Sequence, residues 1–549
     1  MTVAQPFSQE RTMNPPLTRM LAAAGLSMML DGASAQTVQA PSPQAPVAPG
    51  NVFTRMFPDL PAFAEQSDGV RDLMRRFAAQ HGMLDADDNL SDPIQSILKP
   101  AVFSPHNPDN PNMTAGITFL GQFLDHDLTF DKNSQLNVAA SPEATTNFRT
   151  SALDLDTVYG KGPSGSPELY AFGERTIKFR VQVIPGSEQA SKDGVVRFDV
   201  PRDAAGNAVL GDTRNDENVI ISQLHLAFLL FHNAITDHLV EQSDYANASA
   251  ADIFDEARRI AIWHYQWIVL HEFLPLVIGQ KRLDRILEHG PRYYRVDRAT
   301  KQGGSDNSGP RVPVEFSIGA YRFGHSQARP SYRLNFGPLG GAPFFAFLFD
   351  DNIDPNATDP DDLRGGKRAP RRFVDWQTFF DFGDGNVRSN KRIDGKISSV
   401  LMALPGARAP APGLPPDGLQ SLPARTLTRH VDFGLPSGQA IAEKMHMPVL
   451  DADQLHDVAH LSLDNRHTMD KSTPLFYYVL KEAEVMEDGL RLGPVGAQVV
   501  GEVFVGILEA DRASYLSRKP DWKPSLPSAK KGSFTMRDLL NFAGVVHPV

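Results

Sequence analysis

The sequence predicts a mainly α protein, in which one large helical domain carries long loops and little β structure. First, its strongest periodic segments repeat apolar residues at the three- and four-residue spacing of a helix face. Second, convincing alternating strands are few. Third, no internal repeat is visible, and none of the Gly-, Pro- and charge-rich loops divides the chain into self-sufficient halves.

Five segments are expected to form the helical framework. One of them is a long apolar segment that begins at Asn218. The segments cover residues 114–127, 218–242, 251–279, 473–486 and 493–516. The loops between them include "ATKQGGSDNSGP" at 299–310, "DPNATDPDDLRGGKRAPRR" at 354–372 and "ALPGARAPAPGLPPDG" at 403–418.

The N-terminal region has the composition of a leader followed by a linker. Residues 20–30 resemble the apolar part of a signal peptide, with Arg19 before it and "ASA" at 33–35 as a cleavage site, although Asp31 interrupts the pattern. We therefore expect a possible leader at residues 1–35, a Pro/Ala-rich linker at 36–50 and the folded domain at 51–549. A functional leader predicts export to the periplasm or medium, and otherwise the protein is cytoplasmic.

The composition excludes several classes of function. The net charge of -11 argues against nucleic acid and anionic membrane surfaces as partners, because both attract clustered Lys and Arg. The lack of cysteine excludes thiolate catalysis and zinc–thiolate sites. No apolar run was expected to be long enough to span a bilayer, so no transmembrane segment is predicted.

The stretch "GQFLDHD" at 121–127 places one histidine between two carboxylates at the end of an apolar helix. Gln122 and His126 are four residues apart and project from one helix face. Asp125 and Asp127 point roughly 100° to either side of His126, so they cannot serve the same centre. By itself the motif is also explained by a helix end with solvated aspartates and a core histidine.

Two further motifs combine charged residues with histidine or glycine. In "GDTRNDEN" at 211–218, Arg214 and Glu217 could face one site, although helix capping by Asp216 and Glu217 explains the same pattern. In "GAYRFGHSQARPSYRLN" at 319–335, Gly324 removes a side chain next to His325, so that a flat ligand could approach closely. The alternative is a core histidine in a helix that ends before the next proline.

Together, and in this order, the three motifs resemble the animal-type haem peroxidase superfamily, particularly its bacterial members. Supporting matches are "SALDLDTVYG" at 151–160, "VDFGLPSGQAIA" at 431–442 and "LGPVGAQVVGEVFVGILEAD" at 492–511, and the resemblance runs from about residue 53 to the C-terminus. It implies an enzyme that reduces hydrogen peroxide and oxidises small aromatic donors or halides through a ferryl intermediate.

The resemblance assigns the distal side of a haem b group to three residues. His126 matches the distal base, Arg214 the distal arginine and Gln122 the glutamine that lines the peroxide and halide pocket. A neutral histidine can move a proton between the two oxygens of peroxide, and a cationic arginine stabilises the charge that develops. The physiological electron donor is not specified.

The resemblance also assigns residues that hold the haem. His325 matches the proximal iron ligand, Arg322 an arginine near a propionate, and Asp125 and Glu217 the carboxylates that form ester bonds to haem. In the mammalian granulocyte enzyme a methionine forms a third covalent bond to haem. Asn218 occupies the matching position here, so this bond is not expected. The family asparagine that hydrogen-bonds the proximal histidine was expected near "DKSTPLFYY" at 470–478, but this stretch contains none.

A calcium ion is the second implied cofactor. The expected ligands are oxygen atoms only, as calcium prefers, and they come from Asp127, Thr150, the Ala152 carbonyl, Asp154 and Asp156. Asp156 replaces a serine that many relatives carry, which adds negative charge to the site.

Other classes of function remain as alternatives. A fatty-acid dioxygenase or cyclooxygenase of similar scaffold needs a tyrosine three residues before the proximal histidine, where this chain has Arg322 and Tyr321 is one step further away. A non-haem iron or zinc site could use His264, His271 and Glu272. His225, His232 and His238 on another helix could be interpreted in the same way. Packing in the core explains the histidines of both helices equally. A third class is a non-catalytic adhesion or matrix module on the same scaffold.

Overall fold

The computed structural model describes residues 51–296, 310–354, 356–405, 420–455 and 469–548. Its α-helices are α1 (Asp68–Phe77), α2 (Pro93–Leu98), α3 (Pro100–Phe103), α4 (Ala115–Leu128), α5 (Asp156–Tyr159), α6 (Gly162–Gly165), α7 (Ser187–Ala190), α8 (Val219–Val240), α9 (Ala250–Ile268), α10 (Leu274–Ile278), α11 (Gln280–His289), α12 (Gly324–Gln327), α14 (Leu422–Asp432), α15 (Gly438–Lys444), α16 (Ala452–Leu455), α18 (Leu475–Glu487), α19 (Pro494–Ala510), α20 (Tyr515–Arg518) and α21 (Met536–Phe542).

The β structure of the described residues consists of four antiparallel pairs. They are β1 (Asp109–Thr114) with β8 (Ser389–Lys391), β2 (Tyr170–Phe172) with β3 (Ile177–Phe179), β4 (Gln182–Val183) with β5 (Phe198–Asp199), and β6 (Ser331–Asn335) with β7 (Phe344–Phe347). In register, Thr114 pairs with Ser389 and Ser331 with Phe347. The prediction of a mainly α fold with long loops and little β structure is therefore confirmed.

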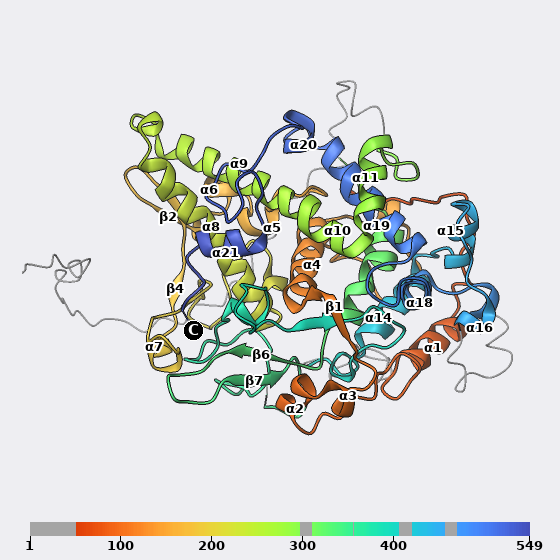
Figure 1. The fold of residues 1–549 in the computed structure, drawn as a ribbon. Coiled ribbons are helices and arrows are strands. Elements are labelled where there is room, and N and C mark those ends of the chain that lie inside the picture. Colours follow the sequence, from red (N-terminus) through yellow and green to blue (C-terminus); the bar gives the residue numbers. More distant parts are fainter. Residues whose placement is uncertain (1–50, 297–309, 355, 406–419, 456–468, 549) are drawn as a thin grey trace, which may run out of the picture. The chain divides into compact units, whose positions relative to one another are not determined.

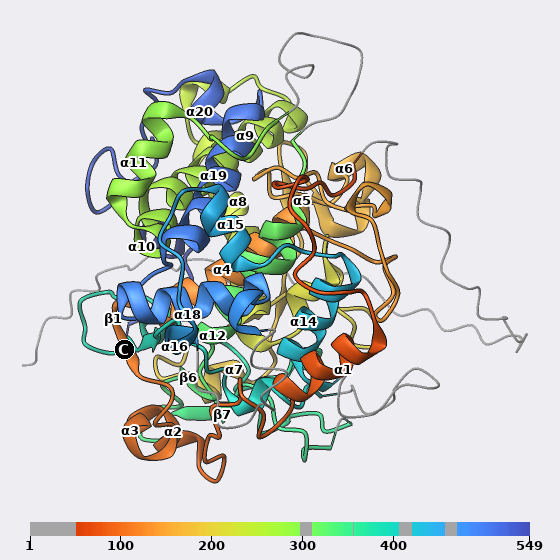
Figure 2. The same ribbon diagram turned by 90° about the vertical axis from the view of Figure 1, so that its right-hand side faces the viewer.

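α4 lies at the centre of the fold in both views and packs against α8 and α12 (Figures 1 and 2). β1 leads directly into α4, and β6 begins shortly after α12 ends. Both helices are therefore fixed at one end by a strand pair. Buried side chains from each described segment between residues 53 and 543 form one continuous hydrophobic core around these elements.

Two expected helices are interrupted. The segment 251–279 forms α9, a π-helical turn at Val269–Phe273 and then α10, where Pro275 has no N–H to donate to the preceding turn. The segment 493–516 ends as a helix at Ala510, because the Asp511 side chain accepts a hydrogen bond from the Ala513 N–H and forms a turn. α20 then begins separately.

α8 corrects the expectation that no apolar segment is long enough to cross a membrane. Within its 22 residues, an 18-residue window has a mean hydropathy of 1.5, which suffices by length and composition. However, 83% of that stretch is buried inside the protein, as is typical of a core helix. The leader and linker predicted at residues 1–50 lie outside the described residues.

Candidate active site

One cavity of about 780 Å³ brings the three sequence motifs together. Its walls come from α4, from the turn that precedes α8 and from the segment that leads into α12. The predicted haem-site residues that line it are Gln122, Asp125, His126, Arg214, Glu217, Arg322 and His325. Their proposed roles stay predictions, but residues about 200 positions apart in the chain share one space.

The aspartates of "DHD" are buried, so the alternative of solvated aspartates at a helix end is wrong. Asp125 is 8% exposed, His126 5% and Asp127 0%. Asp125 lies on the cavity wall, whereas Asp127 faces the 150–157 loop and accepts hydrogen bonds from the Leu155 and Thr157 N–H groups. The helix thus directs neighbouring carboxylates to different environments, as the 100° separation predicts.

His126 is held in one orientation by a buried asparagine. Its Nδ1 lies 2.8 Å from the Oδ1 of Asn215, which can only accept, so Nδ1 carries the proton and Nε2 keeps its lone pair. The Asn215 amide donates to Thr157 Oγ1 and His225 Nδ1 at 2.9 Å each, which fixes the amide orientation. Burial lowers the pKa of His126 to about 4. His126 is therefore a neutral base near pH 7.

Asn215 was not predicted as a site residue, although it lies inside the "GDTRNDEN" motif. Its sequence separation from His126 is 89 residues, and no local pattern marks it as a partner. The same holds for Arg364 and Arg425, two further arginines that line the cavity.

Arg214 is oriented by a carboxylate and an aromatic ring. Asp212 accepts hydrogen bonds from its Nε at 3.1 Å and its Nη2 at 2.7 Å, and the His126 carbonyl accepts from Nη2 at 3.0 Å. The guanidinium carbon lies 4.1 Å from the ring centre of Phe130. Despite its burial, Asp212 has a pKa lowered to about 2 by Arg214 and Arg149. Arg214 therefore stays cationic in a fixed position beside the cavity.

Asp216 and Glu217 do not supply the side-chain caps of this motif, so the alternative of capping by this pair is wrong. Asn218 caps α8 by accepting from the Ile221 N–H at 2.9 Å, and Asp216 instead pairs with Arg202. Glu217 faces the cavity, where its carboxylate accepts from the Gln122 side chain at 3.2 Å. The surrounding protein removes the carboxyl group from bulk water, and this desolvation raises its pKa to about 7.

The opposite wall carries Arg322 and His325. The Nε of Arg322 donates to the Ser317 carbonyl at 2.7 Å, and its Nη1 lies 3.2 Å from Asp125 on α4. Gly324 lines the cavity, and a Cβ atom there would meet nothing within 4 Å. A flat group can therefore approach the backbone next to His325, as expected from the sequence.

His325 has a buried Nδ1 with no hydrogen-bond partner among the described residues. The ring packs edge-on against Phe476, with ring centres 6.0 Å apart. Phe476 belongs to the stretch in which an asparagine was expected but is missing. Burial lowers the pKa of His325 to about 3, so the ring is neutral and its other nitrogen can bind a metal. Two neutral imidazoles that line one cavity, with cations nearby, fit an iron-centred planar cofactor.

Three of the expected calcium ligands form an acidic cluster, in which Asp127 is fully buried and Asp154 and Asp156 are partly buried. One carboxylate oxygen from each of Asp127, Asp154 and Asp156 lies within 4.8 Å of the others. Thr150 Oγ1 donates to Asp154 at 2.9 Å, and Ala152 lies in the same loop. Burial and mutual repulsion raise the pKa of Asp127, and they raise that of Asp156 to about 7. The donor set is oxygen only. Its three carboxylates outnumber the one paired cation, Arg149 at 3.5 Å from Asp156, and a divalent cation would balance the remaining charge.

The alternative metal site on α9 and the following turn is wrong. His264 Nδ1 donates to the Ile260 carbonyl, His271 pairs with the Tyr515 hydroxyl at 3.2 Å, and the Glu272 carboxylate accepts from the Met536 N–H. These three side chains do not form a metal-holding group among the described residues. On α8, His225 and His232 are likewise buried and bound to Asn215 and Tyr159.

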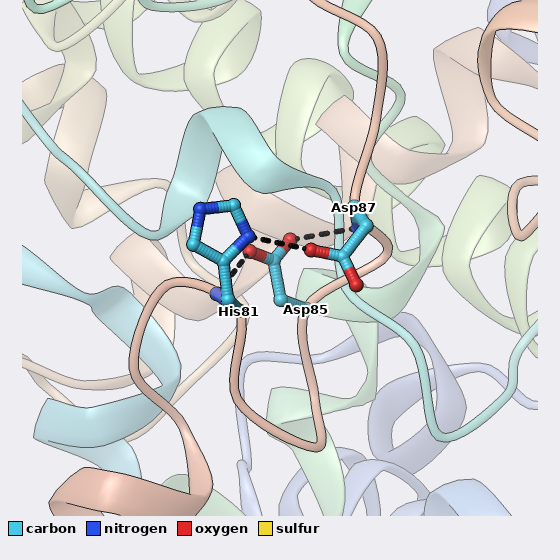
Figure 3. Close-up of side chains that lie close together, drawn as sticks. All are labelled: His81, Asp85 and Asp87. Atoms are coloured by element: carbon cyan, nitrogen blue, oxygen red, sulfur yellow. Dashed lines mark hydrogen bonds and ion pairs between the residues drawn. The ribbon is translucent and has the colours of Figure 1, made fainter.

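A second group with metal-binding residue types lies outside the cavity, at His81, Asp85 and Asp87 (Figure 3). Asp85 is fully buried, and its two oxygens accept from the backbone N–H groups of His81 and Asp87 at 2.7 and 3.0 Å. His81 and Asp87 have positive φ angles of 59° and 49°, a strained conformation that these bonds stabilise. We therefore interpret these three residues as a hydrogen-bonded group that stabilises the loop in which they lie.

Comparisons with known proteins agree with this geometry. Residues 132–338 match the animal haem peroxidase family, a range that includes Arg214 and His325 but begins after His126. A chorion peroxidase from Drosophila melanogaster is 25% identical over 401 residues, which cover 69% of this chain and 44% of that protein. The chain spans less than half the length of the curated relatives that it matches first.

Two solved structures share the fold. Peroxidase A from Dictyostelium discoideum has a TM-score of 0.51 and 16% identity, with 85% of this chain and 89% of that chain covered. The fatty acid alpha-dioxygenase of Arabidopsis thaliana has a TM-score of 0.52 and 14% identity, with 90% and 79% covered. At these identities the likeness concerns the fold alone. The family resemblance drawn from the three motifs is confirmed.

Proposed function

Because the chain carries an animal haem peroxidase domain, we propose that it is a haem peroxidase that reduces hydrogen peroxide and oxidises small aromatic donors or halide ions. The observation that carries the proposal is the cavity that the neutral base His126, the cation Arg214 and His325 line together. The domain is proposed to extend over residues 51–549.

His126 would act as the acid–base group. Asn215 holds the proton on Nδ1, which leaves the Nε2 lone pair free to take a proton from peroxide and to return it to the departing oxygen. A pKa of about 4 keeps the ring neutral before the reaction. The fixed tautomer means that no reorientation is needed when the proton moves.

Arg214 would stabilise the negative charge that develops as the oxygen–oxygen bond breaks. Its Nε and Nη2 are held by Asp212, and its Nη1 has no hydrogen-bond partner among the described residues. A preoriented cation costs little reorganisation during the reaction. Gln122 would help to position peroxide or halide from the same helix face as His126.

Haem, when bound, supplies an iron that exchanges electrons with peroxide and the donor. His325 would bind the iron, and Arg322 would pair with a propionate. Asp125 and Glu217 both line the cavity and would be the carboxylates that form ester bonds with haem. Asn218 caps α8, so no third bond to haem is proposed at this position.

A calcium ion would stiffen the wall behind His126. The proposed ligands are Asp127, Thr150, the Ala152 carbonyl, Asp154 and Asp156, three of which are the clustered carboxylates. Since Asp127 directly follows His126 on α4, an ion at this site would fix the end of the helix that carries the base. Export through a leader at residues 1–35 is also proposed.

To test the proposal, the purified protein is supplied with haem and assayed both for peroxide-dependent oxidation and for oxygen uptake on fatty acids. Hydrogen peroxide should oxidise an aromatic donor or iodide, with little peroxide-independent oxygen uptake on polyunsaturated fatty acids. The opposite result would favour the dioxygenase alternative. Tyr321 also lines the cavity, but its hydroxyl donates to the Gly121 carbonyl at 3.1 Å, which ties it to α4. A protein that binds no haem would exclude both enzymes.

A further inference from the structure

A second cavity, of about 330 Å³, is strongly basic although the chain as a whole carries a net charge of -11. We call it the basic pocket. Its cationic lining residues are Arg55, Arg292, Arg295, Arg311 and Lys444, and its lining contains one carboxylate, Asp59. Five cations against one carboxylate give a formal charge of +4 around a small volume.

The cations of the basic pocket are poorly neutralised. Arg55 donates to the backbone carbonyls of Phe433 and Gly434 and makes no ion pair with a carboxylate among the described residues. Lys444 lies 3.9 Å from Asp59, but both side chains are largely exposed, and such pairs contribute little. Among the described residues, the three remaining arginines make no ion pair. Like charges gathered in this way repel one another unless an anion is bound.

Two buried glutamates hold the walls of the pocket in place. Glu315 accepts hydrogen bonds from the Met56 and Phe57 N–H groups at 2.9 and 3.0 Å. Glu502 accepts from two consecutive N–H groups of the opposite wall, those of Tyr293 at 2.6 Å and Tyr294 at 2.8 Å. Each of the two segments is therefore fixed by a buried carboxylate, so the arginines project from a rigid frame.

The floor of the pocket is aromatic. The rings of Phe57 and Tyr293 have centres 5.8 Å apart, and the Arg292 guanidinium lies 5.2 Å from the Tyr293 ring centre. Tyr293 is anchored further by a hydrogen bond from its hydroxyl to the Met445 carbonyl at 3.3 Å. A ligand would thus meet guanidinium groups around its edge and an apolar surface beneath.

We propose that the basic pocket binds a small anion carrying two or more negative charges on phosphate groups, either free in solution or as the headgroup of an anionic lipid. Four of its five cations are arginines, whose planar forks match phosphate oxygens in pairs. A phosphate monoester carries close to two negative charges near neutral pH, which suits the excess of cations. The site shares no lining residue with the large cavity, so it does not depend on haem.

The first experiment is calorimetric titration of the full chain with inorganic pyrophosphate at roughly physiological salt, where weak surface attraction is largely screened. We expect one binding site and a rise in thermal stability with added anion. The double variant R292A/R295A removes two exposed cations and should weaken binding at least about tenfold. The matched control R76A/R285A removes two exposed arginines elsewhere and should bind within about twofold of the wild type.

The second experiment separates the two sources of phosphate. The protein is sedimented with phosphatidylcholine vesicles that contain phosphatidic acid, with and without excess pyrophosphate. Binding in solution without co-sedimentation assigns a free anion, and co-sedimentation that pyrophosphate abolishes assigns a lipid headgroup. The proposal is overturned if the wild type binds neither probe, if R292A/R295A binds like the wild type, or if the control weakens equally. Unchanged unfolding of R292A/R295A without anion shows that the variant is folded.

Discussion

The two histidines of the cavity are held in different ways. His126 lies in a chain of directional bonds, with Asn215 at its Nδ1 and Thr157 and His225 beyond. His325 is held by packing against Phe476, and its Nδ1 has no partner among the described residues. Burial makes both rings neutral, with pKa values of about 4 and about 3.

The difference corresponds to the tasks proposed for the two side chains. A proton-transfer base must present one nitrogen in one tautomer before the substrate arrives, so its other nitrogen is bonded. A metal ligand receives its orientation from the metal bond itself. A bonded Nδ1 would also raise the basicity of a ligand, and the unbonded Nδ1 of His325 therefore predicts a weakly basic iron ligand. Five predictions test this comparison, from the largest expected effect to the smallest.

The largest effect is expected from His325→Ala, because nothing else on that wall can replace the iron ligand. The variant should lose the ligand-dependent visible spectrum of ferric haem and all measurable peroxidase activity. Haem content and spectrum are measured after reconstitution, with His264→Ala as a buried-histidine control outside the cavity. An unchanged ferric spectrum and haem content in His325→Ala would contradict the assignment.

His126→Ala should slow the reaction with peroxide by about 10² to 10⁴ while haem content stays normal, since general acid–base groups contribute factors of this size. Stopped-flow absorbance after mixing with peroxide measures the rate. In the wild type the rate should fall only as the pH approaches about 4, because protonation of His126 then removes the base. Unimpaired reaction in the variant would remove His126 from the mechanism.

Asn215→Ala should cost about 10- to 100-fold in the same rate, the usual range for residues that orient a functional histidine. Haem binding through His325 should be unaffected, because Asn215 contacts His126 and not His325. The effect is therefore confined to the His126 side of the cavity. Asn215→Asp keeps an acceptor for Nδ1 and should retain more activity than Asn215→Ala. Equal rates in the wild type and Asn215→Ala would show that packing alone orients His126.

Calcium should stabilise the end of α4 that carries His126. Saturation at 100 times the dissociation constant would add about 2.7 kcal/mol to the free energy of unfolding. Affinity should decline as the pH falls below about 7, because protons compete for Asp156 and its neighbours. Metal analysis and thermal unfolding with and without chelator test this prediction, and Asp154→Asn should weaken the response. Absence of calcium together with chelator-insensitive unfolding would exclude the site.

The smallest effect concerns the helix that follows Glu217. Asn218→Ala removes the cap of α8 and should lower the free energy of unfolding by about 1 kcal/mol, whereas Asn218→Ser should restore most of it. Denaturant unfolding measures the difference. Equal stability of all three proteins would mean that α8 is held by core packing alone.

The sequence by itself determined the helical class, the positions of α4, α8 and α18, and the motifs that identify the family. Helical periodicity and local spacing are properties of neighbouring residues, so they can be read without the fold. The same spacing correctly separated Asp125 from Asp127. It failed at the two interrupted helices, where Pro275 and the turn at Asp511 outweigh a continuous apolar pattern.

Only the tertiary structure decided which distant side chains contact one another in the site. Asn215 meets His126 across 89 residues, and the two walls of the basic pocket meet although about 235 residues separate Arg55 from Arg292. Such contacts depend on how the helices pack, and no local pattern encodes them. Burial has the same origin, because the pKa of His126 or Asp156 shifts only when distant segments close over the side chain and exclude water.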